Sequence, residues 1–225
     1  MKEHPILFSA PMVRAILEGR KTQTRRVCKN KVYANGLGFN GHDFNCHNDY
    51  LPPSALLMDY REGGYDSTTS DLEGWGEACP YGQPGDRLWV RETHAIVPRT
   101  AYAMSDGVQQ TLRPDDNHDA AIYREGWERS TGGFRWRPSI HMPRWASRIL
   151  LEVVSVRVER LQDISEADAE AEGAPLELGV LERVTLGAKA RYRSGFCRLW
   201  SSINGRESWD ANPWVWVVEF RRVAP

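Results

Sequence analysis

Hydrophobic and polar residues alternate most regularly late in the chain. Val154, Val156 and Val158 alternate with polar residues within the segment Ile149–Leu161, which predicts a β-strand. A second strand is expected over residues 214–220. A third, entered through a turn, is expected over residues 85–93. Alternation in this third strand would turn one set of side chains to each face: Leu88, Val90 and Glu92 against Trp89, Arg91 and Thr93.

Apolar residues at helical spacing predict three helices. Ser9 is a suitable N-cap for a short first helix, which Gly19 ends. The capping-box pattern at residues 163–166 opens a second helix that ends near Gly173. A third helix is expected over residues 188–203.

Two segments, near residues 29–84 and 98–133, show no sustained periodicity and are interpreted as irregular insertions. Because strands and helices follow one another in mixed order, we expect an α+β fold. Its sheet should be mostly antiparallel or form a small barrel, with helices at the rim. No repeat or linker divides the chain, so a single domain over residues 1–225 is expected.

The composition is that of a soluble globular protein. Of 225 residues, 41% are hydrophobic and 26% charged, and the net charge of -1 argues against a protein that coats nucleic acid by charge alone. No apolar run is long enough to span a membrane, and the first residues do not resemble a secretory signal. We therefore expect a cytoplasmic protein whose four cysteines are thiols or ligands rather than disulfides.

The segment from Gly19 to Arg26 concentrates basic residues beside threonines. A threonine hydroxyl attacks a carbonyl only if a base removes its proton, and Lys21 becomes such a base if burial or neighbouring cations lower its pKa. Cooperation with Thr24 requires a turn or bulge, because a regular strand would place the two on opposite faces. The alternative interpretation is a solvated basic turn.

An acidic helix over residues 166–172 offers a partner for this lysine. Glu172 stands in the last turn, where a carboxylate opposes the helix dipole, so a cation such as Lys21 would stabilise it there. Glu166 and Asp168 are better explained as the solvated face of the helix.

Aromatic and basic residues also come together in a third candidate site. Trp89, Arg91 and Glu92 of the predicted strand and His141 of the loop at residues 138–144 would suit a pocket that stacks a nucleobase and bonds its edge; Trp136 is a second stacking residue. Alternatively, Arg91 and Glu92 simply pair with each other, and His141 has a structural role.

Metal-binding and phosphate-binding motifs are not evident. His42, Cys46, His47 and Cys79, with Cys28, include soft ligands, but their spacings match no zinc pattern. The chain has no phosphate-binding glycine loop, no GxSxG and no HExxH. We expect neither a metal nor an organic cofactor.

Several of these elements together resemble the ASCH domain, a family with a PUA-like β-barrel. The resemblance rests on the element GRKTQTRR at residues 19–26, on GDRLWVRE at residues 85–92, and on the late strand with the helix AEAEG at residues 169–173. The order of these elements along the chain, together with the loop at residues 136–145, resembles that of ASCH proteins common in bacteriophages and prophages. The two insertions fall outside the resemblance.

The resemblance implies an activity. Bacterial ASCH enzymes of about half this length remove the acetyl group from N4-acetylcytidine with a lysine, a threonine and a glutamate. These residues correspond here to Lys21, Thr24 and Glu172, with Glu170 as the fallback for the glutamate. Other members are linked to RNA binding or RNA cleavage, so a reader of RNA or of a modified base is the alternative.

The expected function is therefore an amidohydrolase that acts on a nucleoside-like small molecule, with a short RNA as the alternative partner. Lys21 would deprotonate Thr24, and Glu172 would position Lys21 or the hydrolytic water. Substrate contacts are expected from six further residues: Arg20, Arg26, Trp89, Arg91, Glu92 and His141.

Overall fold

The computed structural model describes residues 1–28, 79–130, 133–177 and 191–223. These residues form an α+β fold with two separate sheets, and no closed barrel is detected within the described ranges. The elements in chain order are β1 (Glu3–Leu7), α1 (Ala10–Leu17), β2 (Gln23–Val27), β3 (Arg87–Arg91), β4 (His94–Pro98), β5 (Gln110–Leu112), β6 (Asp119–Tyr123), the short 3-10 helices η3 (Ser139–His141) and η4 (Arg144–Ala146), β7 (Leu150–Arg160), η5 (Leu161–Asp163), α4 (Glu166–Ala171), α5 (Tyr192–Asn204), α6 (Glu207–Asp210) and β8 (Trp214–Val223).

The larger sheet has five strands in the order β1-β3-β7-β8-β2. Only β1 and β3 run parallel; the other neighbours are antiparallel. The two edge strands are not paired with each other, but Arg26 of β2 donates a hydrogen bond of 2.5 Å to the carbonyl of Leu7 at the end of β1. A side chain thus links the two edges of the sheet.

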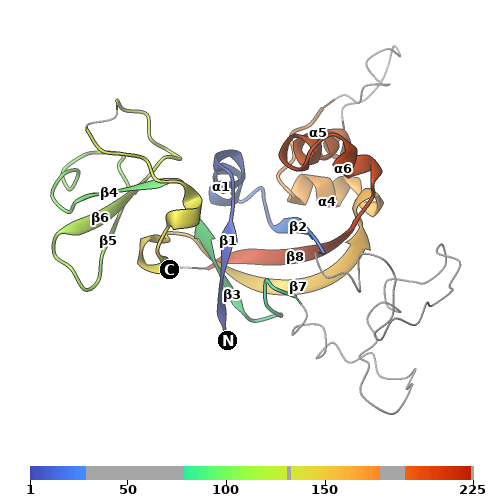
Figure 1. Ribbon diagram of the computed structural model, residues 1–225, viewed down its shortest axis with the longest axis horizontal. Helices are drawn as coiled ribbons and strands as arrows, with labels where there is room; N and C mark the ends of the chain where they lie inside the picture. The colour runs from blue at the N-terminus through green and yellow to red at the C-terminus, as the bar shows by residue number, and fades with distance from the viewer. Residues whose placement is uncertain (29–78, 131–132, 178–190, 224–225) are drawn as a thin grey trace, which may run out of the picture.

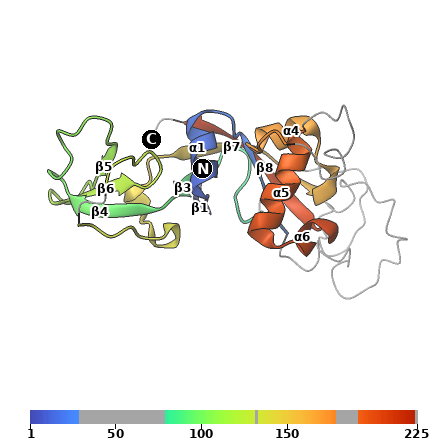
Figure 2. The same cartoon turned by 90° about the horizontal axis from the view of Figure 1, so that it is seen from above.

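Figure 2 shows this sheet in the middle of the molecule, with the second sheet at one end and α4, α5 and α6 at the other. The core is divided in the same way. One apolar cluster lies on the large sheet and contains Val13 of α1, and another lies between that sheet and α4 and α5. Burial of these apolar faces holds the helices on the sheet.

The predicted alternation in β7 holds only in part. A register shift between Val153 and Ser155 marks a β-bulge, and Val154 is 50% exposed. Because the extra residue interrupts the two-residue period, Val154 does not share a buried face with Val158, which is 2% exposed.

The predicted helix boundaries are close to those observed. Ser9 is the N-cap of α1 and Gly19 follows it with a φ of 75°, a conformation that favours glycine. Ser165 caps α4 by accepting a hydrogen bond from the backbone N–H of Asp168, so the cap lies two residues after the start of the predicted capping box, and Asp163 belongs to η5. The third predicted helix corresponds to α5, although residues 188–190 lie outside the described part.

The expectation of an irregular insertion at residues 98–133 is wrong. Strands β5 and β6 lie within it and pair with β4 in the order β4-β6-β5. Alanines on β6 give little periodic signal, yet tertiary packing buries both faces of that strand. The insertion predicted from residue 29 lies outside the described ranges up to residue 78.

Several elements had no sequence prediction, among them β1, which is short and half polar, the strands β2 and β4, and the four-residue α6. None of the helices in the described ranges is long and apolar enough to cross a lipid bilayer.

Candidate functional site

Lys21 and Glu172 meet although 151 positions separate them in the chain. The Lys21 Nζ donates hydrogen bonds of 2.8 Å to the Glu172 Oε2 and to the Glu172 backbone carbonyl. Lys21 is 2% exposed and Glu172 is 3% exposed. A backbone bridge between the same two residues ties the segment before β2 to the end of α4. The pair is therefore held by backbone and side chain together.

Arg25 holds the second carboxylate oxygen of Glu172. Its Nη1 lies 3.2 Å from the Glu172 Oε1, and its Nη2 lies 2.9 Å from Glu159 and 3.4 Å from Asp168. Gln23, on the same face of β2, donates to the backbone carbonyl of Asp168. The alternate residues of β2 thus face α4, and they fix the Glu172 carboxylate between two cations.

Thr24 projects from the opposite face of β2, the face it shares with Arg26. Both the Lys21 Nζ and the Arg26 guanidinium lie over the ring of Phe8, at 5.7 and 5.3 Å from its centroid. Thr24 is 2% exposed. Lys21 precedes the first residue of β2 and contacts Glu172 on the same side as Arg25. Among the described residues no hydrogen bond joins Lys21 to Thr24.

Burial dominates the electrostatics of this cluster. Desolvation lowers the pKa of Lys21, while Glu172 opposes this effect and the nearby guanidinium groups of Arg26 and Arg25 add to it. Burial likewise lowers the pKa of Arg26. Lowering the pKa of the amine increases the fraction of Lys21 that is neutral and able to accept a proton.

Two neighbouring candidates point away from this cluster. Glu170, the fallback for the glutamate, is exposed at the surface of α4. Arg20 pairs with Glu18 in solvent. Of the two glutamates considered for the role, Glu172 is the one that contacts Lys21.

The aromatic and basic residues of β3 form a different surface. The guanidinium groups of Arg91 and Arg144 both lie over the Trp89 ring, at 5.4 and 6.0 Å from its centroid. Arg91 donates to the backbone carbonyl of Ile140, and His141 beside it is exposed. Strands β7 and β8 separate β3 from β2 in the sheet order. These residues therefore do not join the Lys21–Glu172 pair.

Glu92 is held by Arg148, a residue that the sequence analysis did not identify. Two hydrogen bonds of 2.8 Å join the Arg148 Nε and Nη2 to the two carboxylate oxygens. Burial raises the pKa of Glu92, and Arg148 opposes that shift. The sequence offered one signal: an arginine two residues before β7, next to the apolar run Ile149–Leu151, where a charged residue needs a buried partner.

The cysteines in the described ranges are free thiols. Cys28 and Cys79 are buried, and burial raises their pKa values to about 12 and about 11. No group of three or more potential metal ligands gathers among the described residues. His42, Cys46 and His47 lie outside the described part.

No protein-family model, no curated protein and no solved structure matches this chain closely enough to identify a relative.

Proposed function

We propose that this protein is an amidohydrolase of the ASCH type, on a PUA-like small barrel, that removes the acyl group from a nucleoside-like amide such as N4-acetylcytidine. The observation that carries the proposal is the buried contact between Lys21 and Glu172. Desolvation lowers the pKa of Lys21, and a lysine with a lowered pKa accepts a proton more readily than a solvated one.

The reaction proceeds through an acyl-enzyme. The fraction of Lys21 that is neutral takes the proton of Thr24 as the hydroxyl oxygen bonds to the amide carbonyl carbon. The tetrahedral intermediate collapses, the C–N bond breaks, and the amine leaves with the proton carried by Lys21. Water then attacks the ester, Lys21 again accepts and returns a proton, and the carboxylic acid is released.

Glu172 and Arg26 support these steps. Glu172 holds the amine of Lys21 through its Oε2, and Arg25 in turn fixes the orientation of that carboxylate. Arg26 lies over the same Phe8 ring as Lys21 and offers positive charge to the developing oxyanion. Thr24 has to approach the amine when substrate enters, since catalytic hydrogen bonds often tighten only in the complex.

The test is hydrolysis of a panel of N4-acylated cytidines followed by chromatography. Thr24→Ala removes the nucleophile and is expected to abolish turnover, whereas Thr22→Ala, at an exposed position two residues away, leaves it unchanged. Lys21→Met is expected to lower kcat by about 10²–10⁴-fold. Unchanged turnover in Thr24→Ala, or hydrolysis of no amide by the folded parent protein, contradicts the proposal.

A second candidate function, binding of RNA or of a modified base without reaction, is favoured by the two guanidinium groups that lie close to the Trp89 ring. Phosphate contacts from Arg91 and Arg144 would make oligonucleotide affinity fall steeply with added salt. An oligonucleotide affinity that does not depend on salt, or shortening of the RNA on a gel, argues against a protein that binds RNA without reaction.

A further inference from the structure

The Glu172 carboxylate belongs to an array of charged side chains that lie between the large sheet and α4. Arg25 of β2 and Arg157 of β7 are both in register with Val217 of β8, so the two arginines share one face of the sheet. Asp168 of α4 contacts both of them, at 3.4 and 3.2 Å. The members of this charged array are Lys21, Glu172, Arg25, Glu159, Asp168, Arg157 and Glu219.

Three carboxylates share Arg25. Its Nη1 lies 3.2 Å from the Glu172 Oε1, while its Nη2 lies 2.9 Å from the Glu159 Oε2 and 3.4 Å from the Asp168 Oδ2. The Arg25 side chain is 0% exposed, so water and salt screen these contacts little. Glu159 is the nearest of the three and therefore competes with Glu172 for the charge of Arg25.

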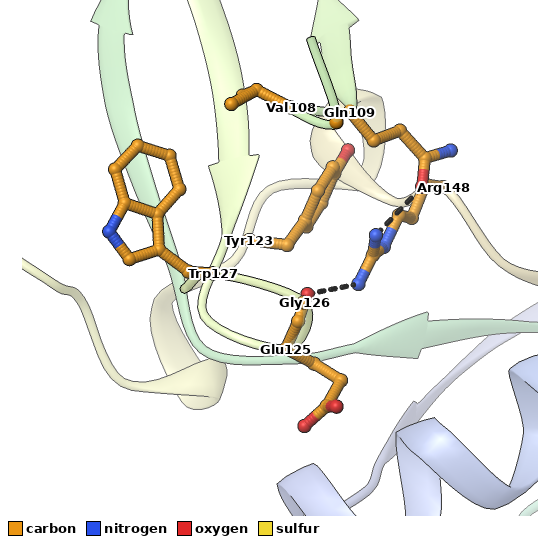
Figure 3. A pocket seen from close by; sticks show the side chains of 8 residues that line it. Val108, Gln109, Tyr123, Glu125, Gly126, Trp127 and Arg148 are labelled. Carbon is orange, nitrogen blue, oxygen red and sulfur yellow. Dashed lines mark hydrogen bonds between the residues drawn. The ribbon is translucent and has the colours of Figure 1, made fainter. Parts of the chain in front are cut away.

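Arg148, another buried arginine, instead has one carboxylate to itself. Its Nε and Nη2 donate at 2.8 Å to the two oxygens of Glu92. Figure 3 shows the same guanidinium at the wall of a cavity of about 130 Å³, where it also donates to Gln109 and to the carbonyl of Glu125. By contrast, the Arg25 Nε donates to no described residue, and Glu172 receives a single bond from Arg25. The hold of Arg25 on Glu172 is therefore the looser of the two.

A looser hold leaves Glu172 to Lys21, whose Nζ donates to the Glu172 Oε2 at 2.8 Å. The other charged groups that act on this amine are Arg25 and Arg26 of β2, and α1 contributes the carbonyl of Ala15, which accepts from the Lys21 backbone N–H. A closer approach of Arg25 to Glu172 would weaken the hydrogen bond to Lys21 and bring positive charge nearer to the amine. Both changes lower the pKa of Lys21.

We infer that Glu159 is a positioning residue for the base of the proposed reaction: by holding Arg25, it leaves the Glu172 carboxylate to the amine of Lys21. Asp168 holds Arg25 in the same way from α4, at a longer distance. The consequence for catalysis rests on the proposed function, whereas the competition for Arg25 does not and is measured on Lys21 itself.

The experiment is a pH titration of the full chain, labelled with ¹³C at the Cε of lysine and followed by NMR. The Lys21 signal is identified by its loss in Lys21→Met. Glu159→Gln is expected to lower the titration midpoint of Lys21 by about half a pH unit, which raises the neutral fraction of the amine about threefold. Arg25 keeps two carboxylates in this variant and Arg157 keeps two, so the fold is retained.

Two further variants make the test specific. Glu219→Gln removes the same charge from the array at a residue that contacts Arg157 but not Arg25, and it is expected to leave the midpoint of Lys21 unchanged. Asp168→Asn is expected to shift the midpoint in the same direction as Glu159→Gln, and it decides the question if circular dichroism shows that Glu159→Gln is unfolded. An unchanged or raised midpoint in Glu159→Gln, or an equal shift in Glu219→Gln, would overturn the inference.

The pH profile of amide hydrolysis separates this inference from the proposed function. The acid limb of kcat/KM reports the base of the free enzyme, so Glu159→Gln should move it to lower pH by the same half unit, roughly, as the NMR midpoint. A shifted Lys21 signal without any hydrolysis supports the role of Glu159 and contradicts amide hydrolysis alone. Hydrolysis with an unshifted Lys21 signal contradicts the role of Glu159 alone.

Discussion

Removal of one partner from the buried pair of Lys21 and Glu172 should destabilise the protein strongly, and removal of both should cost less. Lys21 contacts a single carboxylate, whereas Glu172 contacts both Lys21 and Arg25. Glu172→Leu therefore leaves the buried amine without a counter-charge, while Lys21→Met leaves the carboxylate with one remaining cation.

The expected magnitudes follow from this difference. Breaking a buried ion pair costs about 3–5 kcal/mol. We expect Lys21→Met to lower the free energy of unfolding by about 3 kcal/mol and Glu172→Leu to lower it by about 5 kcal/mol. The double variant should be more stable than Glu172→Leu alone, because an apolar pair needs no counter-charge. The coupling energy should therefore exceed about 3 kcal/mol, the upper end of the usual range for residues in contact.

Urea unfolding at neutral pH, followed by circular dichroism, measures these free energies. The exposed pair of Arg144 with Glu3 is the control, and Arg144→Met is expected to change the free energy of unfolding by less than about 1 kcal/mol. If the two single variants cost no more than this control, or if their effects simply add in the double variant, the pair does not stabilise the fold as argued here.

Three other predictions follow. Gly195→Ala in α5 should destabilise the protein by about 1–3 kcal/mol in thermal unfolding, because the added Cβ would lie 1.8 Å from the carbonyl oxygen of Pro175; a gain in stability, as at an ordinary helical glycine, would contradict this. The free energy of unfolding should fall as the pH rises above 9, because the thiols of Cys28 and Cys79 ionise near pH 9 in the unfolded chain but keep their protons to about 12 and about 11 in the folded protein. The loss is up to about 1.4 kcal/mol per pH unit for each thiol. The variant with alanine at both positions should show a weaker dependence of the unfolding free energy on pH. Arg148→Met should cost about 3–5 kcal/mol in urea unfolding because it leaves a buried carboxylate unpaired, and a cost below 1 kcal/mol would show that the carboxylate is solvated.

Local sequence signals determined much of the secondary structure. Serine caps and positive-φ glycines act over one helical turn, so the end of α1 follows from Gly19 and the start of α4 from Ser165, whereas Ser9 stands at the N-cap of α1 without a side-chain capping hydrogen bond. The long apolar alternations in β7 and β8 likewise need no tertiary information. The bulge at Val154 does need it, because it depends on pairing with β8.

The sequence also indicated which residues of the candidate site could react, but not which of them are in contact. Lys21 and Thr24 stand out as residue types, and Glu172 stands out because a carboxylate at a helix end needs a cation. Their contact depends on α4 packing against the start of β2, and only the tertiary structure supplies that packing. The same holds for Arg148 and Glu92, which are 56 positions apart.

What the chain determined by itself is therefore the set of capped helices, the long strands and the residue types able to perform acyl transfer. What only the tertiary structure decided is which charges are buried together and that the segment at residues 98–133 forms a sheet. The physical reason is range: caps and periodicity act between near neighbours in sequence, whereas desolvation and ion pairing depend on contacts between distant segments.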